Sequence, residues 1–253
     1  MSNSIEILNY PAHAQLKVIT GRGAEYGENI NNIPVLIHEL KNLAHEYPLC
    51  FMKDPDTGQF NLYSLLGFAP EENLYLDKNI WDANYIPLHI QRQPFIVGRH
   101  HTTENAEQPS KARNDGFISI NTQSKRISHT QGEPLFNSDG TPTAYLNSIN
   151  ELLSQLTPSE ILTKAFITQL LNHQLLEAAR INIAFNDGSI FSYEGIYTIN
   201  TDRLNSLSEK EINQLQEQHF LAPTQLIIHS LKQLQRLIDL KNNRLQGKKN
   251  ETA

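Results

Sequence analysis

The alternation of hydrophobic and polar residues predicts strands and one helix in the N-terminal half of the chain. Residues 16–19 and 73–76 alternate and are expected to form strands. Apolar residues at helical spacing predict a helix over residues 34–47, which ends at Pro48 because proline disfavours the helical conformation in the residue before it. Two apolar stretches flank a turn rich in Asp, Pro and Gly within residues 48–64 and predict a hairpin. The predicted order is β-α-β-β-β.

The C-terminal half has mostly helical periodicity. Apolar residues form one stripe over residues 145–156, and the capping box at 157–160, with Pro158 at the first helical position, predicts a new helix that runs to about Ala179. Residues 181–193 alternate on both sides of an Asn-Asp-Gly turn and predict a hairpin. A second capping box begins at Ser208 and predicts a short helix. The apolar residues Ile227, Leu231, Leu234 and Ile238 predict a last helix, with fraying after Leu240.

The middle of the chain is less regular. Residues 77–100 mix aromatic residues, prolines and arginines without a clear period. Residues 100–116 are polar and are expected to form a loop, and residues 117–120 are expected to form a strand. Turn residues near position 140 mark a mild boundary between the two halves.

The length of 253 residues fits one large domain or two small ones. We predict an α+β fold. An N-terminal α+β lobe at 1–140 contains antiparallel hairpins, and a mainly helical lobe at 141–253 contains a hairpin at 181–199. The alternative is that both lobes belong to one continuous domain. A chain of this length buries enough surface to fold without disulfides or structural metals.

Composition excludes several classes of protein. Lys and Arg number 21 and Asp and Glu 27, so the formal net charge is −6. A general binder of polyanions has a basic excess, so no nucleic-acid partner is expected. Cys50 is the only cysteine, which excludes an intramolecular disulfide and a zinc or iron–sulfur site built from cysteines of one chain.

The sequence also bears on the compartment. No stretch approaches the roughly 18 apolar residues that span a bilayer, so no transmembrane segment is expected. The first residues lack both a basic region and an apolar core, so no signal peptide is expected either. We therefore expect a soluble, cytoplasmic protein. Export through a signal other than a cleaved N-terminal one is compatible with the same sequence.

Searches for catalytic and metal-binding spacings give little. None of the ten histidines is followed two positions later by Asp or Glu, and no His-Glu-x-x-His sequence is present. The Asp54-x-Asp56-x-Gly58 sequence resembles the start of a calcium loop, but Leu65 occupies the twelfth position, where an acid is required. The adjacent His100 and His101 are a poor ligand pair, and Cys50 lies in an apolar run typical of a buried thiol. We therefore expect no metal and no cofactor.

One aromatic cluster is a candidate binding site. Trp81, Tyr85, Arg92 and Phe95 gather residue types that concentrate binding energy at protein interfaces. The competing interpretation is a corner of the core, in which prolines fix the path of the chain and the aromatic rings pack inside. Both interpretations remain open, with the core corner favoured.

Short stretches spread over residues 10–240 resemble one protein family. They are His13 with Leu16 and Val18; Glu39 and Ala44 before Tyr47-Pro48; Phe51-x-Lys53-Asp54 with Thr57-Gly58; Leu66-Gly67; Glu72-Asn73-Leu74; Trp81-x-Ala83-x-Tyr85-Ile86-Pro87; Arg92-x-Pro94-Phe95; Gly132-Glu133-Pro134-Leu135-Phe136 with Asp139-Gly140; and Thr163-x-Ala165-Phe166. Together they resemble the bacterial SapC family, named for a surface-array (S-layer) locus. The family has paired arginines where Gln91-Arg92-Gln93 keeps one, and a carboxylate near the position of Asn121.

The resemblance implies a role but no chemistry. Proteins of this family look like accessory components of surface-layer or TonB-dependent uptake loci in Gram-negative bacteria, and no biochemical activity is assigned to them. A peptide-transport permease has the same name. A permease needs membrane-spanning segments, and this sequence has no apolar stretch long enough to be one, so it does not resemble the permease. We therefore expect a non-catalytic accessory protein that contacts a protein partner encoded in such a locus, and the oligomeric state stays open.

The alternative is an enzyme that modifies a peptide or a carbohydrate through a site dispersed along the sequence. The candidates for such a pocket are His13, Glu39, Lys53, Asp54 and Glu133, with Arg92. Residues separated in sequence can converge in a cleft, so a search for local motifs does not test this hypothesis.

Overall fold

The computed structural model describes residues 5–98 and 117–251, so the predicted loop at 100–116 and the pair His100 and His101 lie outside the described residues. Helices and antiparallel sheets are mixed, which confirms the predicted α+β class. Contacts within the chain define two compact units. Unit 1 comprises Met1–Gly21 and Ile90–Pro158, and unit 2 comprises Arg22–His89 and Ser159–Ala253. Each unit combines two separate stretches of sequence, and the predicted division into residues 1–140 and 141–253 stays a prediction.

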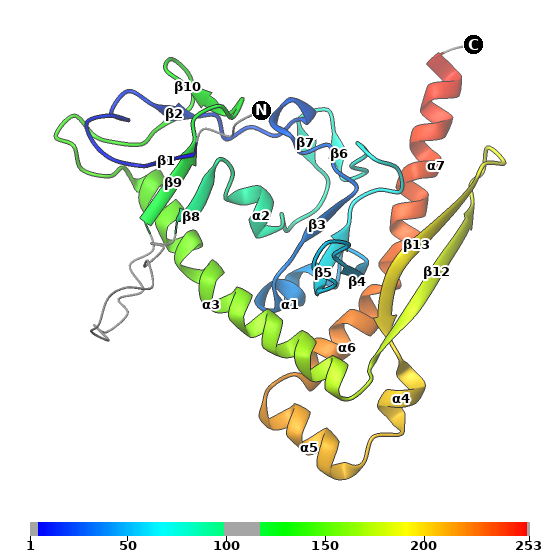
Figure 1. The fold of residues 1–253 in the computed structure, drawn as a ribbon. Helices are drawn as coiled ribbons and strands as arrows, with labels where there is room; N and C mark the ends of the chain where they lie inside the picture. The colour runs from blue at the N-terminus through cyan, green and yellow to red at the C-terminus, as the bar shows by residue number, and fades with distance from the viewer. Residues whose placement is uncertain (1–4, 99–116, 252–253) are drawn as a thin grey trace, which may run out of the picture. The chain divides into compact units, whose positions relative to one another are not determined.

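Unit 1 is built on two small antiparallel sheets (Figure 1). The first has the order β1 (Ile5–Ile7), β9 (Phe117–Asn121), β8 (Phe95–Gly98), and the second the order β10 (Ile127–Ser128), β2 (Lys17–Val18), β11 (Glu133–Pro134). The strands predicted at 16–19 and 117–120 are therefore confirmed. Phe95, Ile120, Val18 and Leu135 are fully buried and form the apolar core of this unit.

Helix α3 (Ala144–Asn172) begins in unit 1 and ends in unit 2. The prediction that a new helix begins at Thr157 was wrong, because the helix continues through Pro158. Apolar residues remain buried at helical spacing on both sides of the proline, and this burial outweighs the loss of one backbone hydrogen bond there. The predicted end near Ala179 was also wrong. Gln174 has a left-handed backbone (φ 56°), and the next residue donates back to the Leu170 carbonyl, which ends the helical path.

Unit 2 contains a five-stranded antiparallel sheet. Its order is β12 (Leu176–Ala184), β13 (Ile190–Ile199), β4 (Leu49–Lys53), β5 (Phe60–Leu65), β3 (Asn32–Pro34), as Figure 1 shows. The predicted hairpins at 48–64 and 181–193 are confirmed as β4–β5 and β12–β13. Phe51 on β4 packs against Phe166 of α3, which in turn packs against Phe220, so α3 and the start of α6 (Leu221–Ser230) cover the core of the sheet.

The helix predicted at 34–47 was wrong in most of its length. Residues Asn32–Pro34 pair with β5 as an edge strand, where proline is tolerated, and only a short 3₁₀ turn (η2, Ile37–Glu39) and α1 (Leu40–Leu43) are helical. The strand predicted at 73–76 was displaced, because β6 (Leu76–Asp77) pairs with β7 (Ile80–Trp81). A 3₁₀ turn (η1, Ala24–Tyr26) and α2 (Leu88–Gln91) complete the elements of the first described stretch.

The C-terminal part of unit 2 consists of helices. They are α4 (Thr201–Asn205), α5 (Glu209–Glu217), α6 and α7 (Gln233–Glu251). The capping box at Ser208 is confirmed, since its hydroxyl accepts from the Glu211 amide and the Glu211 carboxylate accepts from the Ser208 amide. The prediction of a single last helix was wrong, because a turn at residues 231–232 separates α6 from α7, and α7 continues well past Leu240. In the two described stretches, no helix combines the length and apolarity needed to cross a membrane.

Candidate functional site

The aromatic cluster singled out in the sequence is part of the structural framework. Trp81 is 7% exposed, and its indole N–H donates to the Tyr47 hydroxyl at 2.7 Å. That hydroxyl donates in turn to the Tyr85 carbonyl at 2.5 Å. Burial raises the pKa of Tyr47 far above its usual range, so the phenol stays protonated and keeps this chain of hydrogen bonds. Trp81 thus holds the segment that follows β7 against the turn between α1 and β4.

Glu46 fixes the same segment from the other side. Its carboxylate accepts from the backbone amides of Asn84 at 2.8 Å and Tyr85 at 3.1 Å, and it lies 3.5 Å from the Arg236 guanidinium. Arg236 stacks over the Tyr75 ring, with its central carbon 5.3 Å from the ring centroid. These contacts join α7 to residues 81–85, and they leave the Glu46 carboxylate occupied by structural partners.

The two predicted binding residues of unit 1 are also tied into the fold. Arg92 donates to the Phe95 carbonyl at 2.8 Å, and Phe95 is fully buried beside the Tyr145 ring. Trp81 and Tyr85 belong to unit 2, whereas Arg92 and Phe95 belong to unit 1. Binding of a partner by these four residues stays a prediction, and the Trp81 and Phe95 rings are buried.

Glu39 has the most perturbed environment among the enzymatic candidates. Its carboxylate is 1% exposed and accepts from the Leu36 amide at 2.9 Å, the Leu88 amide at 2.8 Å and the Tyr85 hydroxyl at 3.2 Å. Burial raises the pKa of Glu39 to about 7, against the opposing effect of these three donors. A pKa near neutrality suits a general acid or base, but all three donors come from the protein itself and close the carboxylate off.

The other members of the predicted pocket lie in separate surroundings. In unit 1, the His13 ring meets Glu6 at 3.3 Å, and Glu133 is exposed on β11. In unit 2, the Lys53 ammonium lies over the Phe60 ring, and Asp54 accepts from the amide and hydroxyl of Thr57 in the β4–β5 turn. Those hydrogen bonds lower the pKa of Asp54. Among the described contacts, Glu39 shares no partner with Lys53 or Asp54, and the enzymatic alternative stays an untested prediction.

No metal site can be named from the described part of the chain, in which no three His, Cys, Asp or Glu side chains cluster suitably. Cys50 is buried on β4, as its apolar neighbours predicted, and burial raises the pKa of its thiol to about 12. The thiolate needed for nucleophilic or ligand chemistry is therefore suppressed.

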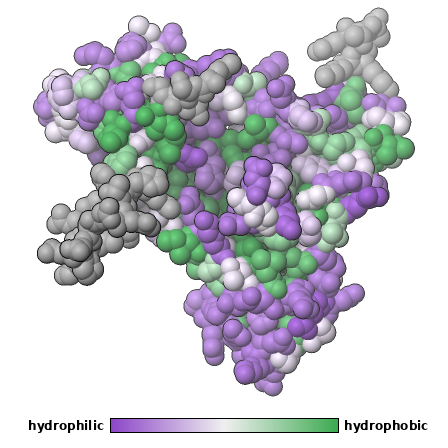
Figure 2. Space-filling model, in the orientation of Figure 1, coloured by the Kyte–Doolittle hydropathy of each residue, from purple (hydrophilic) through white to green (hydrophobic). Residues whose placement is uncertain are grey.

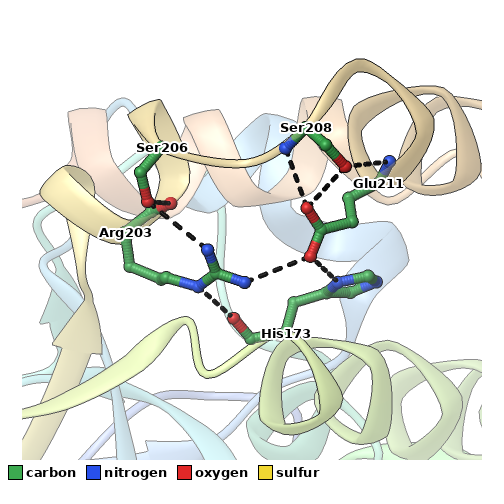
Figure 3. Close-up of polar contacts among 5 residues, drawn as sticks. All are labelled: His173, Arg203, Ser206, Ser208 and Glu211. Atoms are coloured by element: carbon green, nitrogen blue, oxygen red, sulfur yellow. Dashed lines mark hydrogen bonds and ion pairs between the residues drawn. The ribbon is translucent and has the colours of Figure 1, made fainter.

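A polar cluster joins the end of α3 to α4 and α5 (Figure 3). The Glu211 carboxylate accepts from the Ser208 amide and hydroxyl on one oxygen, while its other oxygen meets Arg203 at 3.1 Å and the His173 ring at 3.6 Å. The hydrogen bonds from Ser208 are the main reason that the pKa of Glu211 falls to about 2. Ser208 donates to the carboxylate and not to His173, so this is no nucleophile–base pair. The surrounding surface of α4 and α5, at the bottom of Figure 2, is mainly hydrophilic.

The edge of β12 is a surface able to bind another chain. β12 is one of the two outer strands of the five-stranded sheet, with β13 on its inner side (Figure 1). At one end of the hairpin, Leu175 accepts from the Asn200 amide, and at the other end Phe185 donates to the Ser189 carbonyl. In an antiparallel pair, backbone groups alternate between facing the partner and facing away. The odd-numbered residues of β12 therefore face β13, and the even-numbered ones face outward.

Five residues present their backbone N–H and C=O groups at this edge: Leu176, Ala178, Arg180, Asn182 and Ala184. Four of these residues are exposed, and Leu176 is half-buried. Exposed edges of natural sheets are usually short or protected by charged side chains, above all Lys, by Pro, by a bulge or by a covering element. β12 is nine residues long and contains neither Lys nor Pro, and the charge of its Arg180 is paired with Glu194 of the same hairpin.

A bulge on β13 leaves β12 extended. Ala179 pairs with Ile196 and Ile181 with Tyr193, so Glu194 and Gly195 both lie opposite Arg180. Gly195 takes a positive φ of 77°, which suits the extra residue of such a bulge. The extra residue therefore falls on the inner strand, and the outer edge keeps its regular alternation.

Sequence reasoning missed the length of this strand. The helix predicted from the capping box at 157–160 extends to about Ala179 and so includes the first residues of β12, among which Leu176, Glu177 and Ala178 all favour helices. The alternation of Ile181, Ile183 and Phe185 indicates a strand. Before Ile181 the pattern continues only with the small Ala179, so it indicates the start of the strand weakly. Pairing with residues 196–199 of β13, which is not local, decides in favour of a strand.

Comparison with known proteins agrees with the motifs noted in the sequence. The SapC family model matches residues 8–237. The chain belongs to the SapC family. No curated protein and no solved structure matches it. The SapC match extends from the region before β2 through the first turn of α7 and includes the whole β12–β13 hairpin.

Proposed function

We propose that this SapC-family chain is a non-catalytic accessory protein that binds a strand of another polypeptide at the open edge of β12. The observation that carries the proposal is the row of five outward-facing residues on an exposed nine-residue edge strand. Main-chain hydrogen bonds to such an edge supply affinity for any extended segment, and the flanking side chains supply selectivity.

The surroundings of the titratable candidates support binding rather than catalysis. The carboxylates of Glu39, Glu46 and Glu211 each accept several hydrogen bonds from the protein and hold loops or helix ends together. A catalytic carboxylate has to meet a substrate. The resemblance to accessory proteins of surface-layer or TonB-dependent uptake loci supports a protein partner from such a locus.

The test is affinity capture from cells of the native organism with an edge-blocked variant. Ala178→Pro together with Ala184→Pro removes two outward N–H groups, and proline is compatible with the open side of an edge strand. The matched control, Ala178→Thr with Ala184→Thr, keeps both N–H groups at the same positions. We expect the native chain and the Thr variant to retain the same partner and the Pro variant to lose it, with circular dichroism unchanged.

Equal capture by the native and Pro variants contradicts the proposal. A second pair of variants tests the region predicted from the sequence. If Trp81→Ala and Arg92→Ala abolish capture in folded protein while the Pro variant does not, the binding surface lies in that region instead of at β12.

A further inference from the structure

We infer that the strand which occupies the β12 edge is β12 of a second copy, antiparallel to the first and centred on Ile181. The inference rests on the proposed function, because it takes the open edge as the docking site and names the occupant. Two copies related by a twofold axis perpendicular to the sheet would form one continuous ten-stranded sheet.

The register follows from the orientation of the backbone. A twofold axis perpendicular to the sheet keeps each side chain on its own face of the sheet. Odd-numbered residues of one copy therefore lie opposite odd-numbered residues of the other, and even-numbered residues lie opposite even-numbered ones. With Ile181 opposite its own copy, Ala178 lies opposite Ala184, and Arg180 lies opposite Asn182. These are outward-facing residues, so every pair exchanges backbone hydrogen bonds across the edge.

The side chains are complementary in this register. On one face, Ile181 meets its own copy, and the small Ala179 lies opposite the larger Ile183 on both sides of the axis. Ile181 is half-buried in one chain and gains cover from the second. On the other face, Arg180 lies opposite the neutral Asn182. The guanidinium of Arg180 already contacts the carboxylate of Glu194 in the same copy at 2.9 Å.

The two registers shifted towards the start of β12 are less favourable. Centring the pair on Arg180 would place two guanidinium groups directly opposite each other, and like charges at that position destabilise a sheet. Centring on Ala179 would place the half-buried Ile181 opposite the exposed, charged Glu177. The register centred on Ile181 keeps residues 178–184 paired without either penalty.

A contact made mainly by one strand from each copy lies at the small end of protein interfaces. We therefore expect a reversible equilibrium between monomer and dimer. Light scattering on the full chain should give an average mass that rises with concentration from 28.8 kDa towards twice that value. The Ala178→Pro, Ala184→Pro variant should remain at the monomer mass, and the matched Thr variant should behave like the native chain.

The register is tested by cysteine cross-linking. In this register, Ile181 and its copy form a non-hydrogen-bonded pair of an antiparallel ladder. The Cα atoms of such a pair are about 4.5 Å apart, which is within the range of a disulfide. Ile181→Cys should form a covalent dimer under mild oxidation. Ala178→Cys, on the same edge and more exposed, should not, because its own copy lies six residues along the partner strand. Cys50 is 2% exposed and does not compete.

Each outcome decides the inference. A native chain that stays monomeric up to its solubility limit, or equal cross-linking of the 178 and 181 variants, overturns it. If partner capture still depends on the edge in either case, the proposed function stands and only the occupant was misassigned. Dimerisation that the Pro substitutions leave unchanged also overturns the inference.

Discussion

Two buried serines on neighbouring elements have opposite hydrogen-bonding situations. The Ser64 hydroxyl on β5 is buried, and within the described residues it has no hydrogen-bond partner. The Ser230 hydroxyl at the end of α6 is equally buried, but it accepts from the Leu49 amide at 3.1 Å and donates to the Ile227 carbonyl at 2.6 Å. A buried polar group without a partner costs about 1–3 kcal/mol of stability.

The same substitution should therefore have opposite effects at these two positions. Ser64→Ala removes an unsatisfied hydroxyl and should raise the free energy of unfolding by about 1 kcal/mol. Ser230→Ala leaves the Leu49 amide without its acceptor and should lower it by about 1–3 kcal/mol. Denaturant unfolding followed by Trp81 fluorescence measures both. A loss of stability of similar size in both variants would contradict the assignment.

Glu39 should make stability depend on pH. Burial raises the pKa of Glu39 to about 7 in the folded chain, from an ordinary value of 4.5 for glutamate. Between pH 4.5 and pH 7 the native state therefore binds more protons than the unfolded state. The contribution of Glu39 is fully present below pH 4.5 and is lost as pH rises through 7. The shift of about 2.5 pH units corresponds to a loss on the order of 3 kcal/mol.

The comparison of Glu39→Gln with the native chain isolates this effect. The free energy of unfolding of the native chain should fall between pH 5 and pH 8 relative to that of the variant, because glutamine does not titrate. Glu133→Gln, at an exposed position, serves as the control and should follow the native profile. Parallel profiles for the native chain and Glu39→Gln would show that Glu39 titrates normally.

At the scale of elements, local signals predicted the turns well. The β4–β5 and β12–β13 hairpins follow from turn residues such as Gly58 and Gly188, which both take positive φ values, and the start of α5 follows from the Ser208 capping box. These features depend on chemistry within a few residues, so the sequence alone contains the information.

Elements that depend on distant contacts were predicted poorly. The 34–47 segment has helical periodicity, yet the Thr163 hydroxyl accepts from the Ile37 amide and Glu39 accepts from the Leu88 amide, and these partners stabilise a shorter, broken path. The start of β12 was assigned to a helix for the same reason. Propensity is a weak preference that tertiary pairing overrides.

At the scale of the whole molecule, composition and family membership limit the function without naming it. The single cysteine is buried with a raised pKa, which disfavours thiolate chemistry, and the SapC match covers most of the chain. The β12 edge could not be predicted, because a strand is an edge only through its place in the sheet. The aromatic residues at 81–95 attracted attention by type, whereas their burial depends on distant partners such as Tyr47 and Glu46.

The central claim, that the outward-facing groups of β12 are open to another chain, is tested most directly by amide hydrogen exchange resolved by residue. In dilute protein, the amides of Ala178, Arg180, Asn182 and Ala184 should exchange much faster than those of Ala179, Ile181 and Ile183, which face β13. Addition of the captured partner, or concentration of the chain itself, should slow the first group selectively. Equal protection of both groups in dilute protein would contradict the account.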